Sequence, residues 1–265
     1  MVRRIALLLI AATLCGCGGS SPGVKRLPSE EADYLQARKA YDDENYIRAA
    51  ELLTAFVDEH PGSNRLDEAL LLLGRSHQKT GENLLAIEDF NRLVRDFPQS
   101  SLREEAEFER ARSNFEESLG PAQDPESTEA ALDLMRAYTI RYPEGAFRGE
   151  AEKAIDACLE RLALKAFYNA ETYLKLRQPR GAVLYLEKAL SIRSDFSRAG
   201  EALANLGRMH GRLGESEKAR GAWERLLSHA TPDRIKEDRK LSDLRREAEE
   251  ALRILPPPAT GEEAP

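Results

Sequence analysis

Cysteine, tryptophan and histidine are all scarce in this chain of 265 residues. Of the three cysteines, two lie within the first 17 residues, and only Cys158 lies in the body of the chain. If the two N-terminal cysteines are accounted for by processing, only Cys158 remains, and a single cysteine cannot form an intramolecular disulfide. Cys158 falls on the apolar face of a predicted helix. It is therefore expected to be a small buried hydrophobic residue and not a reactive thiol.

The patterns that accompany catalysis are also absent. The chain has four histidines, which are dispersed along it: His60, His77, His210 and His229. No two of them share the spacing typical of metal ligands. The sequence contains neither a glycine-rich phosphate loop nor a Gly-Xaa-Ser-Xaa-Gly elbow. The sequence therefore predicts a protein that is not an enzyme, with no catalytic residues, no metal site and no cofactor.

Long apolar runs are missing except at the start of the chain. Arg3 and Arg4 precede the apolar run 5–14, which is too short to span a membrane stably and is typical of an export signal. The following Leu14-Cys15-Gly16-Cys17 resembles the bacterial lipobox. That resemblance predicts a signal peptide over residues 1–16, cleavage before Cys17 and lipidation of Cys17. A cleaved secretory signal without a lipid is the alternative.

Two further features refine the expected location. Gly18 follows Cys17, whereas lipoproteins retained in the inner membrane often carry Asp there, so the resemblance favours the outer membrane, with the domain on its periplasmic face. Residues 17–28 contain Gly and Pro but little apolar content, which predicts a flexible tether. The protein is thus expected to contact the membrane through its N-terminal lipid.

Basic residues are outnumbered throughout the predicted mature chain. Removing residues 1–16 leaves 37 basic and 46 acidic residues, a net charge of −9. Such a balance argues against nucleic acid as the main partner.

A repeat of 37 residues runs through the chain. Ala49, Leu53, Phe56 and Pro61 recur 37 positions later as Ala86, Phe90, Leu93 and Pro98. Small residues precede them at the same interval, and three later units share the pattern. The pattern resembles the tetratricopeptide repeat, a pair of antiparallel helices with small residues where the helices cross. It predicts five units between residues 29 and 230 that bury one continuous core.

Two departures from the repeat shape the expected architecture. The Gly and Pro residues of 119–127 predict an extra loop in the third unit. Residues 147–176 contain no Pro and show apolar residues at steps of three and four, which predicts one helix of about 45 Å. The predicted fold is all-α, a tetratricopeptide-repeat solenoid of about five helical hairpins, with an extended helix joining repeats three and four.

The segments after the signal and the tether follow from this arrangement. Repeats one to three are expected over 29–146, and the long helix with repeats four and five over 147–230. Thr231-Pro232-Asp233 is typical of a helix N-terminus and predicts a charged helix over 231–255 that caps the last repeat. Residues 256–265 are expected to be disordered.

The architecture narrows the resemblance to one family. A lipobox, five repeats with a loop in the third and an extended helix opening the fourth resemble the BamD family of lipoproteins. The phrases that carry the resemblance are Glu59-His60-Pro61, Arg95-Asp96-Phe97-Pro98, Ser113-Asn114-Phe115, Gln123-Asp124 and Arg141-Tyr142-Pro143. Ser194 in place of the usual Pro and the charged tail depart from the family. The resemblance implies a component of the β-barrel outer-membrane protein assembly machinery that binds its barrel subunit, accessory lipoproteins and unfolded outer-membrane proteins.

The first helices of the repeats carry the candidate binding residues. In this repeat class the residue after the small crossing residue points to the concave face. These residues are Arg38, Arg75, Arg112, Glu171 and Arg208. The predicted peptide groove lies in the first three units and consists of Tyr34, Arg38, Tyr41, Leu71, Arg75, Phe108, Arg112 and Phe115. Arginines beside aromatic residues suit an extended peptide with a carboxylate, because guanidinium binds carboxylate bidentately.

Three alternatives remain open at the level of sequence. Glu68, Glu105 and Glu201 lie on the same faces, so the arginines could form only surface ion pairs, which contribute little. The protein could be a generic periplasmic repeat lipoprotein that scaffolds envelope biogenesis or secretion. A cell-wall hydrolase on a helical scaffold is the third alternative, and it would need an essential glutamate in a cleft. On the family analogy, repeats one to three form the client groove and repeats four and five dock the partner.

Overall fold

A computed structural model describes residues 29–117 and 126–256 of the chain, and all regular structure in these ranges is helical. The helices are α1 (Glu30–Asp42), α2 (Tyr46–Glu59), α3 (Leu66–Thr80), α4 (Asn83–Asp96), α5 (Arg103–Glu117), α6 (Glu126–Arg141), α7 (Arg148–Lys175), α8 (Pro179–Ile192), α9 (Ala199–Arg212), α10 (Ser216–His229), α11 (Pro232–Glu237) and α12 (Arg239–Ile254). The described part of the chain is therefore all-α, as predicted.

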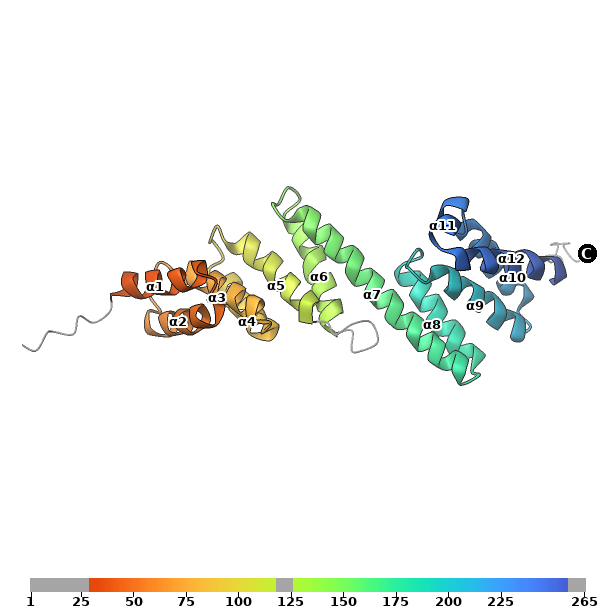
Figure 1. Cartoon of the computed structure of the whole chain (residues 1–265), viewed down its shortest axis with the longest axis horizontal. Coiled ribbons are helices and arrows are strands. Elements are labelled where there is room, and N and C mark those ends of the chain that lie inside the picture. Colours follow the sequence, from red (N-terminus) through yellow and green to blue (C-terminus); the bar gives the residue numbers. More distant parts are fainter. Residues whose placement is uncertain (1–28, 118–125, 257–265) are drawn as a thin grey trace, which may run out of the picture.

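The helices form five consecutive hairpins. Each helix from α1 to α10 packs against its neighbour in sequence, and the first helices of the first four hairpins, α1, α3, α5 and α7, also contact one another in turn. The hairpins follow each other along an extended molecule, with α1 at one end and α12 at the other (Figure 1). This arrangement is the predicted tetratricopeptide-repeat solenoid.

Close helix crossings explain the small residues of the repeat. Ala37 and Ala111 are fully buried at the equivalent position of α1 and α5. In α3, a Cβ at Gly74 would lie 2.6 Å from Cε1 of Phe90. In α9, a Cβ at Gly207 would overlap Cε2 of Trp223. A small residue in the first helix thus makes room for a large ring from the second, which lets the two helices approach.

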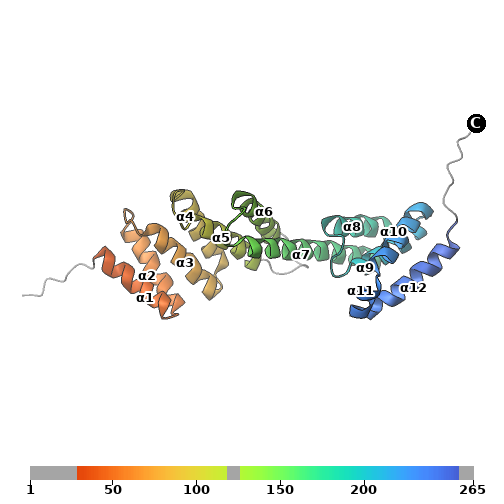
Figure 2. The ribbon, with the colours of Figure 1, turned by 90° about the horizontal axis from the view of Figure 1, so that it is seen from above.

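One helix is much longer than the others and lies in the middle of the molecule. Helix α7 has 28 residues and connects the group α1–α6 with the group α8–α12 (Figure 2). Its first half packs on α5 and α6, and its second half packs on α8. The prediction of one long helix over 147–176 is confirmed, with Phe147 and Leu176 as its caps.

The interior differs from the prediction of one continuous core. Buried apolar residues form four clusters. One cluster lies in the first two hairpins and extends to Ala106 of α5, two lie between α5, α6 and the first half of α7, and one lies in α7–α10 with α12. The cores separate because different turns of α5 and α7 face different clusters, so that the buried residues of α5 belong to two clusters and those of α7 to three. Ala106 and Phe108 of α5 belong to different clusters, and so do Cys158 and Ala163 of α7.

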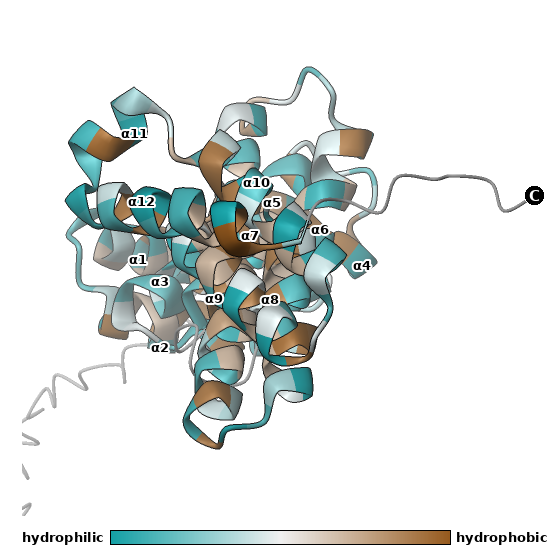
Figure 3. Ribbon diagram, turned by 90° about the vertical axis from the view of Figure 1, so that its right-hand side faces the viewer, coloured by the Kyte–Doolittle hydropathy of each residue, from teal (hydrophilic) through white to brown (hydrophobic). Residues whose placement is uncertain are grey.

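The segment after the fifth hairpin also differs from the prediction. The single helix expected over 231–255 is divided at Asp238, whose backbone is extended with φ −128° and ψ 101°. The Asp238 carboxylate accepts a hydrogen bond from the backbone N–H of Lys240, so Asp238 caps a new helix. This break lets α12 turn back onto α9 and α10, where Leu241, Leu244 and Ala248 are buried. The outward side of α12 is largely hydrophilic (Figure 3).

No helix among residues 29–117 and 126–256 has both the length and the apolar content needed to cross a membrane. The signal peptide 1–16, Cys17, the tether 17–28 and most of the predicted loop 119–127 lie outside the described residues. So does nearly all of the tail 256–265, of which Pro256 alone is described.

Candidate functional site

The three predicted arginines of the first three hairpins occupy equivalent places on α1, α3 and α5. Their side chains are partly exposed, with 49% of Arg38, 31% of Arg75 and 42% of Arg112 accessible. Because these helices lie next to one another, the sequence interval of 37 residues becomes a row of guanidinium groups that crosses the first half of the solenoid.

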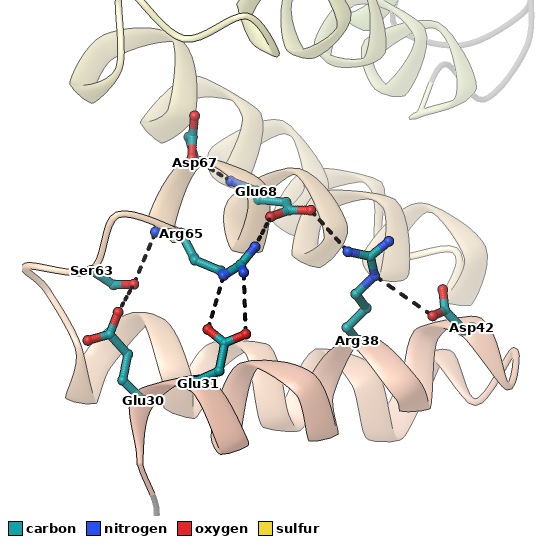
Figure 4. A network of polar contacts seen from close by, with 8 residues as sticks. All are labelled: Glu30, Glu31, Arg38, Asp42, Ser63, Arg65, Asp67 and Glu68. Atoms are coloured by element: carbon teal, nitrogen blue, oxygen red, sulfur yellow. Dashed lines mark hydrogen bonds and ion pairs between the residues drawn. The ribbon is translucent and has the colours of Figure 1, made fainter.

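The first member of the row joins two hairpins. Arg38 Nη1 donates to Glu68 Oε1 of α3 over 3.4 Å, and Arg38 Nε lies 3.8 Å from Asp42 Oδ2. Glu68 also accepts from Arg65 Nη1 over 3.1 Å. Arg65 in turn donates to Glu31, so that a chain of alternating charges runs from α1 to α3 and back (Figure 4). These contacts lie at the surface, where each pair contributes about 0–1 kcal/mol.

Arg75 repeats this arrangement one hairpin further along, because its guanidinium pairs with Glu105 of α5. Arg112 differs. Its Nη2 lies 2.7 Å from Oε2 of Glu109, a carboxylate of the same helix that is only 4% exposed. Arg112 Nη2 also donates to Oε1 of Gln78 over 3.2 Å. The Gln78 amide Nε2 donates to Ser113 Oγ over 2.8 Å and to Glu109 Oε2 over 3.0 Å.

Arg112 also borders a hollow at the turn between α3 and α4. The hollow has a volume of about 360 Å³ and is lined by Gln78, Lys79, Gly81, Asn83, Arg112 and Glu116. Five of these six residues have polar or charged side chains, so the hollow can accept a hydrophilic or charged group. Gln78 and Glu109 were missed by the sequence analysis. The interval of three residues between Glu109 and Arg112 was the signal that could have found the carboxylate.

Three of the predicted groove residues are not at the surface. Tyr34 is 1% exposed, Leu71 is 4% exposed and Phe108 is 2% exposed. Tyr34 packs on Phe56, and Phe108 stacks on Phe147 with ring centroids 4.8 Å apart. Their expected place in the groove lining is therefore corrected. The residues lie on the first helices as predicted, but the neighbouring helices cover them. Burial, together with a contact to Glu68, raises the pKa of the Tyr34 hydroxyl to about 12.

Tyr41 and Phe115 remain partly accessible but have intramolecular partners. Tyr41 meets Tyr46 edge to face, with ring centroids 5.5 Å apart. Phe115 lies under the guanidinium of Arg161 from α7, whose Cζ is 3.8 Å from the ring centroid. The structure thus brings together the three arginines and Tyr41 along α1, α3 and α5, and it turns Phe115 toward the long helix.

The row does not continue with the same partners in the second half of the solenoid. Glu171 of α7 lies 3.6 Å from Arg198 Nη2. Arg208 of α9 donates to Glu247 of α12 through Nε over 2.6 Å. Glu201 pairs with Arg198 and Lys240, so it is not the partner of Arg208. The basic row is therefore a feature of the first three hairpins.

Of the two cysteines with a predicted role, only Cys158 lies within the described residues. Cys158 is fully buried among apolar residues, and burial raises the pKa of its thiol to about 11, which keeps the thiol protonated and unreactive. Cys17, the predicted lipidation site, lies outside the described residues.

Comparisons with known proteins give one family. Residues 28–226 match the family YfiO, which is described as an outer membrane lipoprotein. The outer membrane protein assembly factor BamD of Caulobacter vibrioides is 26% identical over 219 residues, which cover 82% of this chain and 72% of that protein.

Tetratricopeptide-repeat proteins are among the solved structures that this chain matches. One, from Bacteroides fragilis, is 13% identical with a TM-score of 0.40 and covers 85% of this chain and 86% of that protein. Another, from Thermus thermophilus, is 17% identical with a TM-score of 0.36 and covers 85% of this chain and 100% of that protein.

Proposed function

Because the chain belongs to the YfiO family of outer membrane lipoproteins, we propose that it acts in the assembly of outer-membrane proteins. The Caulobacter relative, which is named as an outer membrane protein assembly factor, supports this proposal. In the proposed mechanism the protein binds and positions other chains and performs no covalent chemistry. A row of hairpins suits that role, because stacked repeats present an extended surface on a rigid frame.

The proposed anchor is a lipid on Cys17. It would hold the repeats on the periplasmic face of the outer membrane through the tether 17–28. The sequence Leu14-Cys15-Gly16-Cys17 and the description of the family as lipoproteins support the anchor. Acyl chains on one residue anchor strongly, since each buried methylene contributes about 0.8 kcal/mol.

The proposed client site is the arginine row of α1, α3 and α5. The single observation that carries it is that Arg38, Arg75 and Arg112 stay partly exposed at equivalent positions of three adjacent hairpins. Each guanidinium has a carboxylate partner within the protein, and exposed pairs of this kind are weak. A carboxylate of an unfolded outer-membrane protein can therefore replace the partly exposed Glu68 or Glu105 at little cost and gain a bidentate contact, whereas the buried Glu109 stays paired with Arg112.

The second half of the solenoid is the proposed docking region for the barrel subunit of the assembly complex and its accessory lipoproteins. Helices α7–α10 and α12 share an apolar cluster of their own, which supports the proposal that this half binds its partner independently of the first half. The alternative, a generic periplasmic scaffold, predicts other partners.

The test is a co-purification in mild detergent of the full lipidated chain, followed by identification of the bound proteins. A variant with Arg38, Arg75 and Arg112 changed to Ala should retain the barrel subunit and lose at least about tenfold in bound unfolded clients, which corresponds to about 1.4 kcal/mol. The matched control changes Arg48, Arg92 and Arg95 to Ala. These arginines lie on the second helices α2 and α4 and form similar exposed pairs, and the change in net charge is the same.

If both triple variants lose bound clients equally, client binding depends on the overall charge of the protein and not on the position of these arginines. That result would contradict the proposed client site. Absence of any barrel protein from the wild-type sample would contradict the assembly role and leave the tethered scaffold.

A further inference from the structure

Three potential metal ligands meet at the N-terminal end of the solenoid. Asp33 comes from α1, Glu59 is the last residue of α2, and His60 follows it as the C-cap of that helix. His60 Nε2 lies 3.1 Å from Asp33 Oδ2. One ligand atom of each of the three residues lies within 4.8 Å of the other two. The sequence predicts no metal site, because no two histidines share metal-ligand spacing and Asp33 is distant from His60 in sequence.

The geometry points to a site for a divalent transition metal ion, and we propose that Asp33, Glu59 and His60 bind Zn²⁺. One imidazole and two carboxylates are ligands that zinc accepts, at distances of about 2.0–2.2 Å. Ligand atoms around a tetrahedral ion are then roughly 3.4 Å apart. The Asp33–His60 distance already meets this value, and the exposed Glu59 side chain can close the remaining gap. Three protein ligands leave one position for water or a partner's group.

The charges around the cluster favour a bound cation. Within the described residues, neither Asp33 nor Glu59 pairs with a lysine or an arginine. The neighbouring carboxylates differ, because Glu31 and Glu68 are both neutralised by Arg65 (Figure 4). Two carboxylates held close together without a countercharge repel one another, and a divalent ion removes this repulsion.

The imidazole is also held in place by the fold. The ring of His60 packs on Phe56 with centroids 5.0 Å apart, and the backbone N–H of His60 donates to the Phe56 carbonyl. Such positioning lowers the cost of ordering a ligand. Bound metal would connect α1 to the end of α2, so it would fasten the terminal helix, which has neighbours on one side only. In this proposal the ion holds α1 against the end of α2 and so stabilises the N-terminal end of the solenoid.

The test uses the full chain, purified without a histidine tag and freed of metal, and titrates it with ZnCl₂ by calorimetry. We expect one saturable Zn²⁺ per chain and a higher unfolding temperature with Zn²⁺, because a ligand that binds the folded state stabilises it. MgCl₂ in place of ZnCl₂ should give no comparable binding, since magnesium prefers oxygen ligands alone. Co²⁺ in place of Zn²⁺ should give the intense visible absorption of a four-coordinate ion, in contrast to the weak absorption of the hydrated six-coordinate ion.

The deciding variant is Glu59→Gln, because the exposed Glu59 side chain can be changed without disturbing the Asp33–His60 contact. It should weaken Zn²⁺ binding at least about tenfold. Asp58→Asn is the matched control: this exposed carboxylate lies next in the same helix but outside the cluster, and its loss should leave the affinity unchanged. The proposal is overturned if wild type binds no Zn²⁺, if Glu59→Gln binds as wild type does, or if both variants lose affinity equally.

Discussion

Helix α9 contains three glycines, and two of them, Gly207 and Gly211, have different surroundings. Gly207 faces the ring of Trp223, whereas a Cβ at Gly211 would have no atom within 4 Å. We predict that Gly207→Ala lowers the free energy of unfolding by about 1–3 kcal/mol, because the added methyl forces the packed ring to move. Urea unfolding at equilibrium measures the effect.

Gly211→Ala is the control in the same helix. It should leave the free energy of unfolding unchanged or raise it by up to about 1 kcal/mol, because alanine restricts the unfolded chain and no neighbour is displaced. Equal destabilisation by both substitutions would mean that the close crossing with Trp223 is not what demands glycine at position 207.

The turns between the two helices of a hairpin show that residue type predicts a left-handed backbone at some equivalent positions and not at others. Four equivalent positions have a left-handed backbone, namely Glu44, Gly81, Arg177 and Gly214, with φ between 56° and 82°. Glycine at two of them follows the rule that this region favours it. Glu44 and Arg177 break the rule, so the turn could be placed there only by the repeat interval and not by residue type.

At the scale of elements, one contact recurs between a first helix and the loop that follows its hairpin. Glu30 of α1 accepts from Ser63 Oγ over 2.5 Å, and Asp67 of α3 accepts from Ser100 Oγ over 2.6 Å. Glu104 of α5 accepts from the Ala146 backbone N–H over 2.7 Å. These acids occupy the same repeat position and hold each connecting loop against its own hairpin. Sequence periodicity places them, but only the folded chain shows that the loop is their partner.

The cap helices carry a second element-scale contact, at His229. Arg234 of α11 donates to His229 Nδ1 over 2.7 Å. Burial and the Arg234 guanidinium hold the pKa of His229 below its usual value of 6.5, against the opposing effect of Asp195. His229 therefore stays neutral in the folded protein at a pH where it becomes protonated in the unfolded chain.

The pH dependence follows from this difference. Above about pH 7.5 His229 is neutral in both states and does not affect stability. As the pH falls through 6.5, the unfolded chain binds a proton that the folded protein excludes, so the free energy of unfolding falls until the folded pKa is passed. We predict that the free energy of unfolding falls less between about pH 7.5 and pH 5.5 in His229→Gln than in wild type. Urea unfolding at each pH measures this difference. Identical pH profiles would contradict the assignment, and Arg234→Ala should give an intermediate profile.

The whole molecule consists of two groups of hairpins that share α7. The single tryptophan, Trp223, lies in the cluster of the second group, so its fluorescence reports on that group alone. We predict that Asp156→Pro destabilises the first group by about 3 kcal/mol or more, because proline removes a helical hydrogen bond and clashes with the preceding turn. Far-UV circular dichroism should then show an early transition in urea that tryptophan fluorescence does not follow.

Asp156→Ala is the control, because it removes the same exposed side chain but keeps the helix. Its contact with Arg193 is a surface ion pair, so the change should cost less than about 1 kcal/mol. Circular dichroism and tryptophan fluorescence could instead report the same transition in the proline variant, at a lower urea concentration than in wild type. That result would show that the solenoid unfolds as one unit and would contradict separate unfolding of the two groups.

The sequence by itself determined the local architecture of this protein. Periodic apolar residues, small residues at the crossings and the missing proline in 147–176 are sufficient for five hairpins and a long α7, because helix formation and hairpin packing depend on residues close in sequence. Family membership followed from the same patterns.

Only the tertiary structure decided which side chains are accessible and which distant groups meet. Tyr34, Leu71 and Phe108 are covered by neighbouring helices, and the predicted tail helix breaks at Asp238 so that Leu241 can reach α9. Asp33 meets His60, and the cores separate along α5 and α7. The physical reason is that burial and long-range contacts depend on how hairpins stack, which the repeat pattern of one helix does not contain.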